Sequence, residues 1–350
     1  MGTLYVTQED CFIGKTDERL QVTAQSKQPL GSGFRTQRET LIDVPMIKLD
    51  GVVAVGRATV SPAAIAELLD RNIPLSFLTA TGRYLGRLEP EVTKNVFVRR
   101  AQWAAAGGVD ETTLAASHVV QGFIRGKLKN CRNALLRSRR EGNGSQLDRA
   151  IEKLEQAIAP INRTLAIDSL RGLEGAGSAA YFGSFGQLLL KPDFSFKTRN
   201  RRPPVDPVNA LLSLGYSLLR HDVQSALNIV GFDPYLGYLH TVRYGRPSLA
   251  LDLMEEFRPL VVDAVVLTAI NREFVTLASF ETEPVSGAVS LTREGLKAFL
   301  RLYEQKKQSK FKHPVMQRQC TYQEAFELQA RLLSKYLMGQ TEQYPPLVLR

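Results

Sequence analysis

The hydrophobic pattern of this 350-residue chain changes once, near residue 95, and this change limits the folds that the chain can adopt. Before it, short segments rich in Val, Ile, Leu and aromatic residues alternate with turn signals such as Asp50-Gly51, which is typical of β-strands. These segments are TLYVT, RLQVT, LIDVPMIKLDGVVAVG, IPLSFLT and GRYLGRLE. One helix is predicted among them, in SPAAIAELLDRN, with Ser61 as its N-cap and Pro62 as its first helical residue. The pattern predicts a small β-sandwich with one helix.

From about residue 95 onward, nearly every segment has apolar residues at the spacing of an α-helix. GNGS at residues 142–145 predicts a turn between helices, and the polar, basic and proline-rich residues 191–207 predict a surface loop. Gly231 is expected to end a long helix, and Asp233 and Pro234 are expected to begin the next. The predicted fold class is α+β with two domains. These are a β-sandwich at residues 1–92 and an all-α domain at 93–335, followed by a C-terminal tail at 336–350.

Basic residues outnumber acidic ones, 45 Lys and Arg against 35 Asp and Glu, which gives a formal net charge of +10. Many of them gather in three stretches. The stretches contain Arg125, Lys127, Lys129, Arg132, Arg137, Arg139 and Arg140; Lys197, Arg199, Arg201 and Arg202; and Lys306, Lys307, Lys310 and Lys312. One such stretch is usually a solvated surface, but three of them make nucleic acid the leading class of partner.

Several other classes of protein find no support in the sequence. No apolar run approaches the length of a membrane span, and the N-terminus lacks the pattern of a secretory signal. The three cysteines form no CxxC pair, so a reducing cytoplasm is expected. There is neither a GxxxxGK[ST] phosphate loop nor a GxSxG motif, which leaves nucleotide hydrolysis and the commonest hydrolase class unsupported.

Three acids, Asp252, Glu255 and Glu256, interrupt an apolar segment shortly before Pro259, where a helix should kink. The residues that follow, PLVVDAVVLTAI, are almost all apolar and indicate a buried helix. Like charges clustered on a buried helix repel one another and need a cation to stay ionised. The alternative is that the acids face water and pair with Arg246 or Arg258.

Two further features belong with these acids. His240 lies twelve residues before Asp252, across a tight Gly-Arg-Pro turn. Glu174 lies among small residues, which would let a second helix approach closely, although an exposed Glu in a packed helix hairpin would look the same. Together these residues provide two or three carboxylates and one imidazole, a set that suits Mg²⁺ or Mn²⁺. Zinc is less favoured because the cysteines lack ligand spacing.

Five blocks of the sequence resemble, in the same order, those of the CRISPR-associated protein 1 family, the spacer-acquisition integrases. The blocks are IPLSFLTATGRYLGRLEP, RGLEGAGSAAYF, NALLSLGYSLL, GFDPYLGYLH and SLALDLMEEFRP, and the resemblance runs almost end to end. It implies an N-terminal β-sandwich used in dimerisation and a C-terminal helical domain that holds the metal.

The resemblance also implies a catalytic set of Glu174, His240, Asp252 and Glu255. The metal ligands would be Glu174, His240 and a later acid, which falls on Glu255 by its position in the block, with Asp252 as the alternative. Mg²⁺ or Mn²⁺ held there would assist the attack of a DNA 3′-hydroxyl on a phosphodiester. The residues expected to hold the DNA backbone are Lys197, Arg199, Arg201, Arg202, Arg243, Arg246 and Arg258.

The implied function is insertion of spacer DNA into the CRISPR repeat array, an antiviral defence. The implied partners are double-stranded DNA, as spacer precursor and repeat, CRISPR-associated protein 2, and a second copy of this chain. LIDVPMIKL and GVVAVG are the candidate strands for that homodimer interface, although strands of the core would look alike. Two alternatives stay open: a metal-dependent nuclease acting on branched DNA, and a non-catalytic DNA-binding scaffold.

Overall fold

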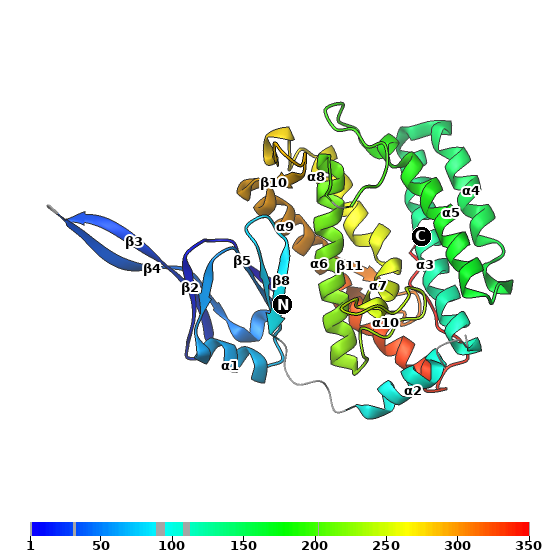
Figure 1. Cartoon of the computed structure of the whole chain (residues 1–350), viewed down its shortest axis with the longest axis horizontal. Helices are drawn as coiled ribbons and strands as arrows, with labels where there is room; N and C mark the ends of the chain where they lie inside the picture. The colour runs from blue at the N-terminus through cyan, green and yellow to red at the C-terminus, as the bar shows by residue number, and fades with distance from the viewer. Residues whose placement is uncertain (1, 31–32, 89–94, 108–112, 202, 350) are drawn as a thin grey trace. The chain divides into compact units, whose positions relative to one another are not determined.

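The computed structural model describes residues 2–30, 33–88, 95–107, 113–201 and 203–349, and only the backbone at 25–30, 33–37, 143 and 144 (Figure 1). The fold is mixed: strands come first, and a helix-rich region follows. The chain divides into two compact units, residues 1–91 with 291–304 and residues 92–290 with 305–350. Residues 291–304 therefore group with the strands, although they follow most of the helices in the sequence.

The first unit contains two four-stranded sheets. One has the order β1-β5-β7-β8, with β1, β5 and β7 parallel and β8 antiparallel to β7. The other has the order β4-β3-β2-β6, with β4, β3 and β2 antiparallel and β6 parallel to β2. The strands are β1 (Gly2–Val6), β2 (Cys11–Thr16), β3 (Arg19–Leu30), β4 (Gly33–Pro45), β5 (Leu49–Val55), β6 (Ala58–Val60), β7 (Leu75–Leu78) and β8 (Tyr84–Leu88).

Side chains of both sheets share one core with helix α1 (Pro62–Asp70). Val22 of β3, Val52 of β5 and Leu68 of α1 are almost completely buried there. The predicted cap of α1 is confirmed, since the Ser61 hydroxyl accepts from the backbone N–H of Ala64 and Pro62 is the first helical residue. Strand β2 was not expected from the sequence, and the β3–β4 hairpin is much longer than the predicted RLQVT strand.

The strands proposed for a homodimer interface mostly face this core. Met46, Leu49, Val52 and Ala54 are buried within the unit. Leu41 and Ile47 are exceptions, since they are 41% and 68% exposed. The apolar character of these strands is therefore explained largely by the core of a single chain.

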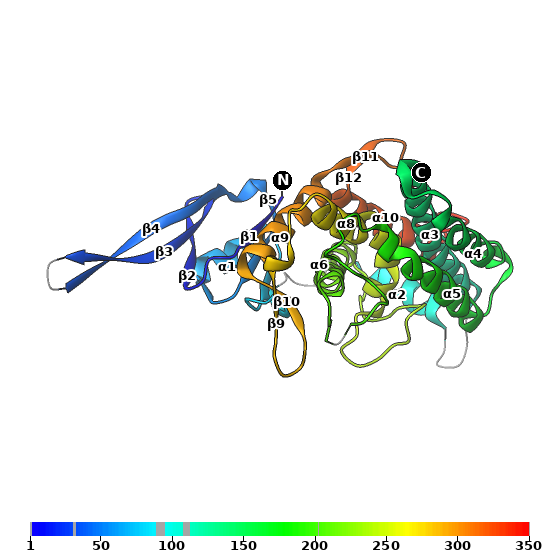
Figure 2. The same ribbon diagram turned by 90° about the horizontal axis from the view of Figure 1, so that it is seen from above.

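The second unit consists mainly of helices. They are α2 (Val96–Ala106), α3 (Leu114–Ser138), α4 (Asp148–Ile158), α5 (Ile167–Phe185), α6 (Pro207–Val230), α7 (Ser248–Leu253), α8 (Ala264–Asn271) and α10 (Tyr322–Leu337), and α9 (Arg293–Gln308) has its last residues here. Helix α3 packs against α4 and α5, which lie beside it in both ribbon views (Figures 1 and 2). A Cβ atom at Gly177 of α5 would lie 2.5 Å from a methyl group of Leu128 of α3, so any side chain at this crossing would require Leu128 to shift.

The expectation of an all-α region is wrong in one respect. Four short strands form two two-stranded sheets, β9 with β10 and β11 with β12. They span Phe280–Thr282, Val289–Leu291, Lys310–Lys312 and Gln319–Thr321. Within the described residues, no helix is both long and apolar enough to span a membrane.

Three predicted helix boundaries are confirmed. Gly142 has a φ of +126° in the turn between α3 and α4, and Gly231 ends α6 with a φ of +105°. At Pro259 the regular α-helix is replaced, because α7 ends at Leu253 and a 3₁₀ turn (Met254–Glu256) and a π-helical turn (Arg258–Asp263) precede α8. These turns carry two of the three acids.

The helix predicted to begin at Asp233 is wrong, because residues 231–247 form neither regular helix nor strand. The physical reason is a competing acceptor. The backbone N–H groups of Tyr238, Leu239 and His240 donate to the carboxylate of Asp252 at 2.7, 2.9 and 2.9 Å. A helix would require those N–H groups to donate to carbonyls four residues earlier.

Candidate active site

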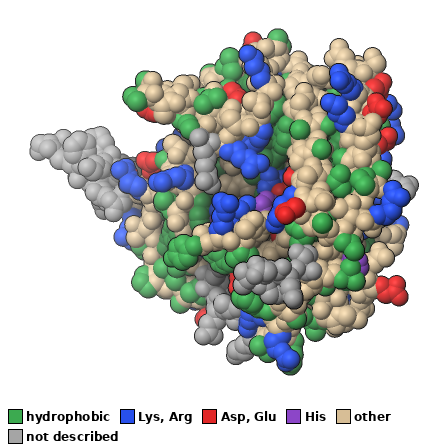
Figure 3. Space-filling view, turned by 45° about the vertical axis from the view of Figure 1, so that its right-hand side comes forward, with side chains coloured by type: hydrophobic (Ala, Val, Ile, Leu, Met, Phe, Trp, Pro, Cys, Tyr) green, Lys and Arg blue, Asp and Glu red, His purple; other side chains and the backbone are tan. Residues whose placement is uncertain are grey.

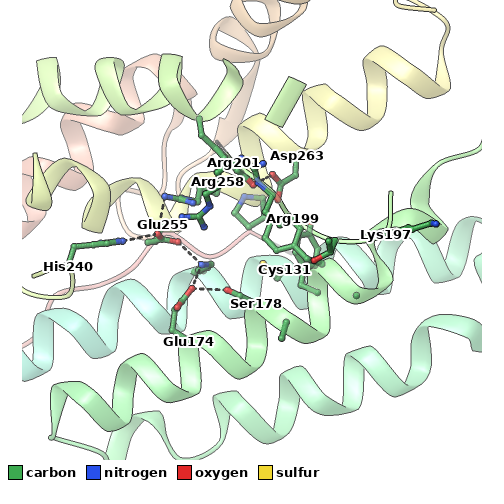
Figure 4. Close-up of a pocket in the computed structure, with 18 residues that line it drawn as sticks. Cys131, Glu174, Ser178, Lys197, Arg199, Arg201, His240, Glu255, Arg258 and Asp263 are labelled. Atoms are coloured by element: carbon green, nitrogen blue, oxygen red, sulfur yellow. Dashed lines mark hydrogen bonds and ion pairs between the residues drawn. The ribbon is translucent and has the colours of Figure 1, made fainter. Parts of the chain in front are cut away.

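Glu174, His240 and Glu255 lie around one cavity of about 570 Å³ in the second unit (Figure 4). Glu174 comes from the middle of α5, His240 from the loop before α7, and Glu255 from the 3₁₀ turn Met254–Glu256. The structure thus brings together three side chains that span 81 positions of the sequence.

A lysine joins the two acids. Lys127 of α3 forms an ion pair with Oε1 of Glu174, and its Nζ lies 2.7 Å from Oε2 of Glu255. Burial would lower the pKa of Lys127, but the charges of Glu255 and Glu174 outweigh it and raise that pKa. The side chain is 8% exposed, so this ammonium is a buried cation that bridges the two carboxylates.

The other oxygen of Glu255 faces a guanidinium and an imidazole. Its Oε1 lies 3.2 Å from Arg258 and 4.0 Å from Nε2 of His240. Burial alone would raise the pKa of Glu255, but the charges of Arg258, Lys127 and His240 together lower it to about 2. Glu255 is therefore ionised at neutral pH.

Asp252 orients His240. Its Oδ1 lies 2.6 Å from Nδ1 of His240, and the carboxylate also accepts the three backbone N–H groups described above. Because a carboxylate accepts hydrogen bonds, Nδ1 carries a proton and Nε2 is the ring nitrogen left for the cavity. Both oxygens of the fully buried Asp252 are used in this way, whereas Glu255 faces the cavity.

The opposite side of the cavity is built on Tyr216 of α6. The Tyr216 hydroxyl donates to Oδ1 of Asp263 at 2.5 Å, and Arg258 and Arg199 lie over the ring at 4.7 and 5.5 Å from its centroid. Burial raises the pKa of Asp263 to about 6, although the hydrogen bond from Tyr216 opposes it. The Tyr216 ring thus lies within cation–π distance of two guanidiniums.

Arg199 is built into the fold. Its guanidinium donates to Oδ1 of Asn209 at 2.7 Å and to Oγ of Ser213 at 3.1 Å. Burial lowers the pKa of Arg199 to about 10, so it stays positively charged at neutral pH.

The residues expected to hold DNA fall into three groups. Lys197, Arg199, Arg201 and Arg258 line the cavity. Arg243 and Arg246 lie on the loop before α7 and do not line it. Arg202 lies outside the described residues. Figure 3 shows basic side chains gathered around a hollow on this face of the molecule.

Sequence reasoning missed Lys127, Tyr216 and Asp263 as parts of this site. A signal for Lys127 was available, because it continues the buried stripe of α3 through Val120, Ile124 and Cys131, at helical spacing. Tyr216 and Asp263 are likewise polar positions within apolar helical segments.

The donor set suits a divalent metal of the Mg²⁺ or Mn²⁺ type. Carboxylate oxygens and one imidazole nitrogen line one cavity, and Oε2 of Glu255 is buried with an ion pair but no hydrogen bond. Among the described residues, no group of three or more His, Cys, Asp or Glu side chains is already drawn together tightly enough to hold a metal. The ammonium of Lys127 lies between the two carboxylates.

A comparison with protein families identifies the family of this chain. The family model of CRISPR associated protein Cas1 matches residues 4–305. The chain therefore belongs to the Cas1 family, as the resemblance of its five blocks implied.

Relatives cover the whole chain. The chain is 37% identical over 350 residues to CRISPR-associated endonuclease Cas1 3 of Thermus thermophilus. This alignment covers 100% of the chain and 98% of the relative. The chain is 36% identical over 356 residues to CRISPR-associated endonuclease Cas1 2 of Rhodospirillum rubrum, with 99% and 98% covered.

Solved structures share the fold. A casposase bound to an integration product has a TM-score of 0.79 at 21% identity, and the match covers 100% of this chain and 95% of the casposase chain. A Cas1 protein from Thermotoga maritima has a TM-score of 0.76 at 23% identity, with 96% and 97% covered. At these identities the likeness establishes the fold alone.

Proposed function

We propose that this chain is a metal-dependent DNA endonuclease and integrase of CRISPR adaptation, which inserts spacer DNA into the repeat array through a 3′-hydroxyl. One observation carries the proposal: in a Cas1-family chain, Glu174, His240 and Glu255 converge on a cavity lined by basic side chains. Related proteins of similar length bear the name CRISPR-associated endonuclease.

Glu174, Glu255 and Nε2 of His240 would hold Mg²⁺ or Mn²⁺. When bound, such an ion neutralises the charge that develops on the attacked phosphate and the leaving oxygen. Asp252 positions His240 and leaves the ligand set to Glu255, because both oxygens of Asp252 already accept hydrogen bonds from the loop.

Arg199 and Arg258 would orient the phosphodiester. Each has a buried Nε–H with no acceptor among the described residues, and each is fixed beside Tyr216. Guanidinium groups held in this way offer donors to phosphate oxygens without reading the bases. Lys197 and Arg201 line the same cavity and are exposed. They would contact further phosphates along the DNA backbone.

The proposed partners are double-stranded DNA, CRISPR-associated protein 2 and a second copy of this chain. Solved structures of the same fold include a complex titled as Cas6-RT-Cas1–Cas2, at 24% identity over 99% of this chain and 36% of that one, and a Cas1–DNA complex. The first unit would be a β-sandwich domain that pairs two copies. The domain boundary near residue 92 belongs to the same proposal, with residues 291–304 added to the first domain.

A cytoplasmic location is also proposed. Cys11, Cys131 and Cys320 are unpaired and buried, which suits a reducing compartment.

The test is a strand-transfer assay with a 3′-hydroxyl DNA duplex and a supercoiled target that carries the repeat, with and without Mn²⁺. Wild type should join the two DNAs only with metal. Glu174→Gln should reduce joining to the background level while DNA affinity stays close to wild type, because the basic side chains remain. Glu152→Gln, on the exposed face of α4, is the matched control and should behave as wild type.

Two outcomes would favour other functions. Cleavage of branched DNA without joining would indicate a general nuclease. Binding with neither cleavage nor joining in any metal would indicate a DNA-binding scaffold.

A further inference from the structure

The ammonium of Lys127 lies between the two acids of the site, where a metal ion bonded to both acids would also lie. Its Nζ contacts Oε1 of Glu174 and lies 2.7 Å from Oε2 of Glu255. Divalent ions bind carboxylate oxygens at about 2.0–2.6 Å, so an ion bonded to both oxygens would need the space that this ammonium fills. The two cations therefore exclude one another.

The fold is built to keep this lysine against Glu255. A Cβ atom at Gly126 would lie 2.8 Å from Cγ of Glu256, so the absence of a side chain lets the Met254–Glu256 turn approach α3. Asn130, one helical turn from Gly126, donates to the carbonyl of Glu256 at 2.9 Å. These contacts fix the turn on α3 and place Glu255 beside Lys127.

Charge explains why the lysine is needed. Glu174 and Glu255 carry two negative charges in a largely buried place, and such charges are unfavourable without a partner. Lys127 and Arg258 balance them. If a divalent ion entered while Lys127 stayed in place, the site would hold four positive charges against two negative ones.

We propose that Lys127 is a built-in counter-cation that holds the metal-ligating carboxylates together and is displaced when the divalent ion binds. This inference rests on the proposed function, since it assigns Glu174 and Glu255 as metal ligands. Lys127 also lines the cavity, so the displaced ammonium remains where a DNA phosphate would lie. Metal binding thereby converts a neutral cluster of two carboxylates, Lys127 and Arg258 into a positively charged phosphate site.

The consequence for metal affinity distinguishes this role from that of a structural ion pair. If the Lys127 ammonium must leave before the divalent ion binds, it weakens the affinity for that ion. Removing the ammonium should therefore raise the affinity. Lys127→Met keeps the length of the side chain and removes the charge. We expect the metal-free variant to bind Mn²⁺ roughly tenfold more tightly than wild type, by electron paramagnetic resonance titration of the full-length protein.

Thermal unfolding of the same proteins gives a second measurement. Without metal, Lys127→Met should unfold at a lower temperature than wild type, because two carboxylates lose their partner. Saturating Mn²⁺ should raise the unfolding temperature of the variant by more than that of wild type. Lys129→Met, two residues away on the same helix and outside the cavity, is the control and should match wild type in both measurements.

The outcomes separate the inference from the function on which it rests. If wild type binds Mn²⁺, Glu174→Gln does not, and Lys127→Met binds it no more tightly than wild type, Lys127 is a structural partner and the inference is wrong. If wild type binds no Mn²⁺ at the site, the metal assignment itself fails.

A structure of the wild type with Mn²⁺ decides the case even if Lys127→Met does not fold. The inference requires that Nζ leave at least one of the two carboxylates while Mn²⁺ contacts both. An ammonium that keeps both contacts, with Mn²⁺ located elsewhere by its anomalous signal, would overturn it.

Discussion

Asp252 supports both the imidazole and the main chain of His240, and this double role makes it the most informative positioning residue. Asp252→Asn would replace one accepting oxygen by an NH₂ group that faces a donor. We expect loss of about 1–3 kcal/mol in the free energy of unfolding, because buried donors lose their acceptor. Strand transfer should also fall by roughly 10–100-fold, as for other residues that orient a metal-bound histidine.

The imidazole itself provides a readout that a loss of stability would not change. In ¹⁵N NMR spectra of the histidines, the Nδ1–H form of His240 should dominate in wild type and lose that dominance in Asp252→Asn. Asp233→Asn is the control, because Asp233 accepts one backbone N–H in the same loop but contacts no histidine in the described residues. An unchanged tautomer in Asp252→Asn would contradict the positioning role.

Lys306 allows a prediction about pH that does not involve the metal site. Burial and the nearby charge of Arg137 lower the pKa of Lys306 to about 8, and its Nζ lies over the ring of Tyr322 at 4.5 Å. An unfolded lysine keeps its proton up to about pH 10.4. Between pH 8 and that value the unfolded chain holds more protons, so this lysine makes stability rise with pH.

Lys306→Met should therefore stabilise the protein at pH 7 by about 1–3 kcal/mol, and the gain should shrink as the pH approaches 10. Urea unfolding at the two pH values measures this, with Lys310→Met on an exposed strand as the control. A variant that is less stable than wild type at pH 7 would show that the contacts of Lys306 with Tyr322 outweigh the cost of burying its charge.

Among individual residues, the sequence predicted the site at positions where a charged residue breaks a pattern of apolar or small residues. Glu174 among small residues, and Glu255 before an apolar helix, were anomalous enough to suggest a shared site. Lys127 was assigned to a basic stretch and Lys307 to another, yet Lys127 is buried in the site and Lys307 is fully buried beside Asp222. A charged residue on a helix looks solvated unless its tertiary partner is known.

Among the elements, the C-terminal segment that follows α10 is part of the helical core. Tyr344 and Leu347 are 2% and 0% exposed. The Tyr344 hydroxyl donates to Oε1 of Glu256 at 2.6 Å, and the N–H of Leu347 donates to Oε2 at 2.7 Å. Residues 336–350 were expected as a tail, and this segment instead fixes the turn that carries Glu255.

Tyr344→Phe should lower the free energy of unfolding by about 1–3 kcal/mol, because the buried carboxylate of Glu256 loses a donor. Urea unfolding measures the change. Tyr244→Phe, at a fully exposed tyrosine, is the control and should have no effect. Equal stability of the two variants would mean that the segment is held by its apolar contacts alone.

Elements defined by local signals were predicted well, and those defined by distant contacts were not. The Ser61 cap and the Gly231 end are local and were found. A helix was predicted to begin at Asp233 and Pro234, but the N–H groups of Tyr238 and Leu239 bind Asp252 instead. The sequence of the loop at 231–247 does not itself indicate that its N–H groups will donate to Asp252, which lies outside the loop.

For the whole molecule, only some of the excess basic residues gather at the cavity. Lys197, Arg201, Arg199 and Arg258 surround the cavity, whereas Lys307 serves the fold. Of the first group, Lys197 and Arg201 are exposed, and Arg199 is tied to Asn209 and Ser213. A test of DNA binding should therefore change Lys197 and Arg201, since a change at Arg199 would also disturb the fold.

The double variant Lys197→Gln/Arg201→Gln should weaken binding to every DNA sequence and flatten its dependence on salt. Each phosphate contact contributes a slope of roughly 0.9 in the logarithm of affinity against the logarithm of salt concentration, so two lost contacts should reduce the slope by about 1.8. Fluorescence anisotropy with duplexes of unrelated sequence, at several salt concentrations, measures this. Arg149→Gln/Lys153→Gln removes the same charge from exposed positions of α4, outside the cavity. If this control flattens the slope equally, net charge and not the cavity holds the DNA.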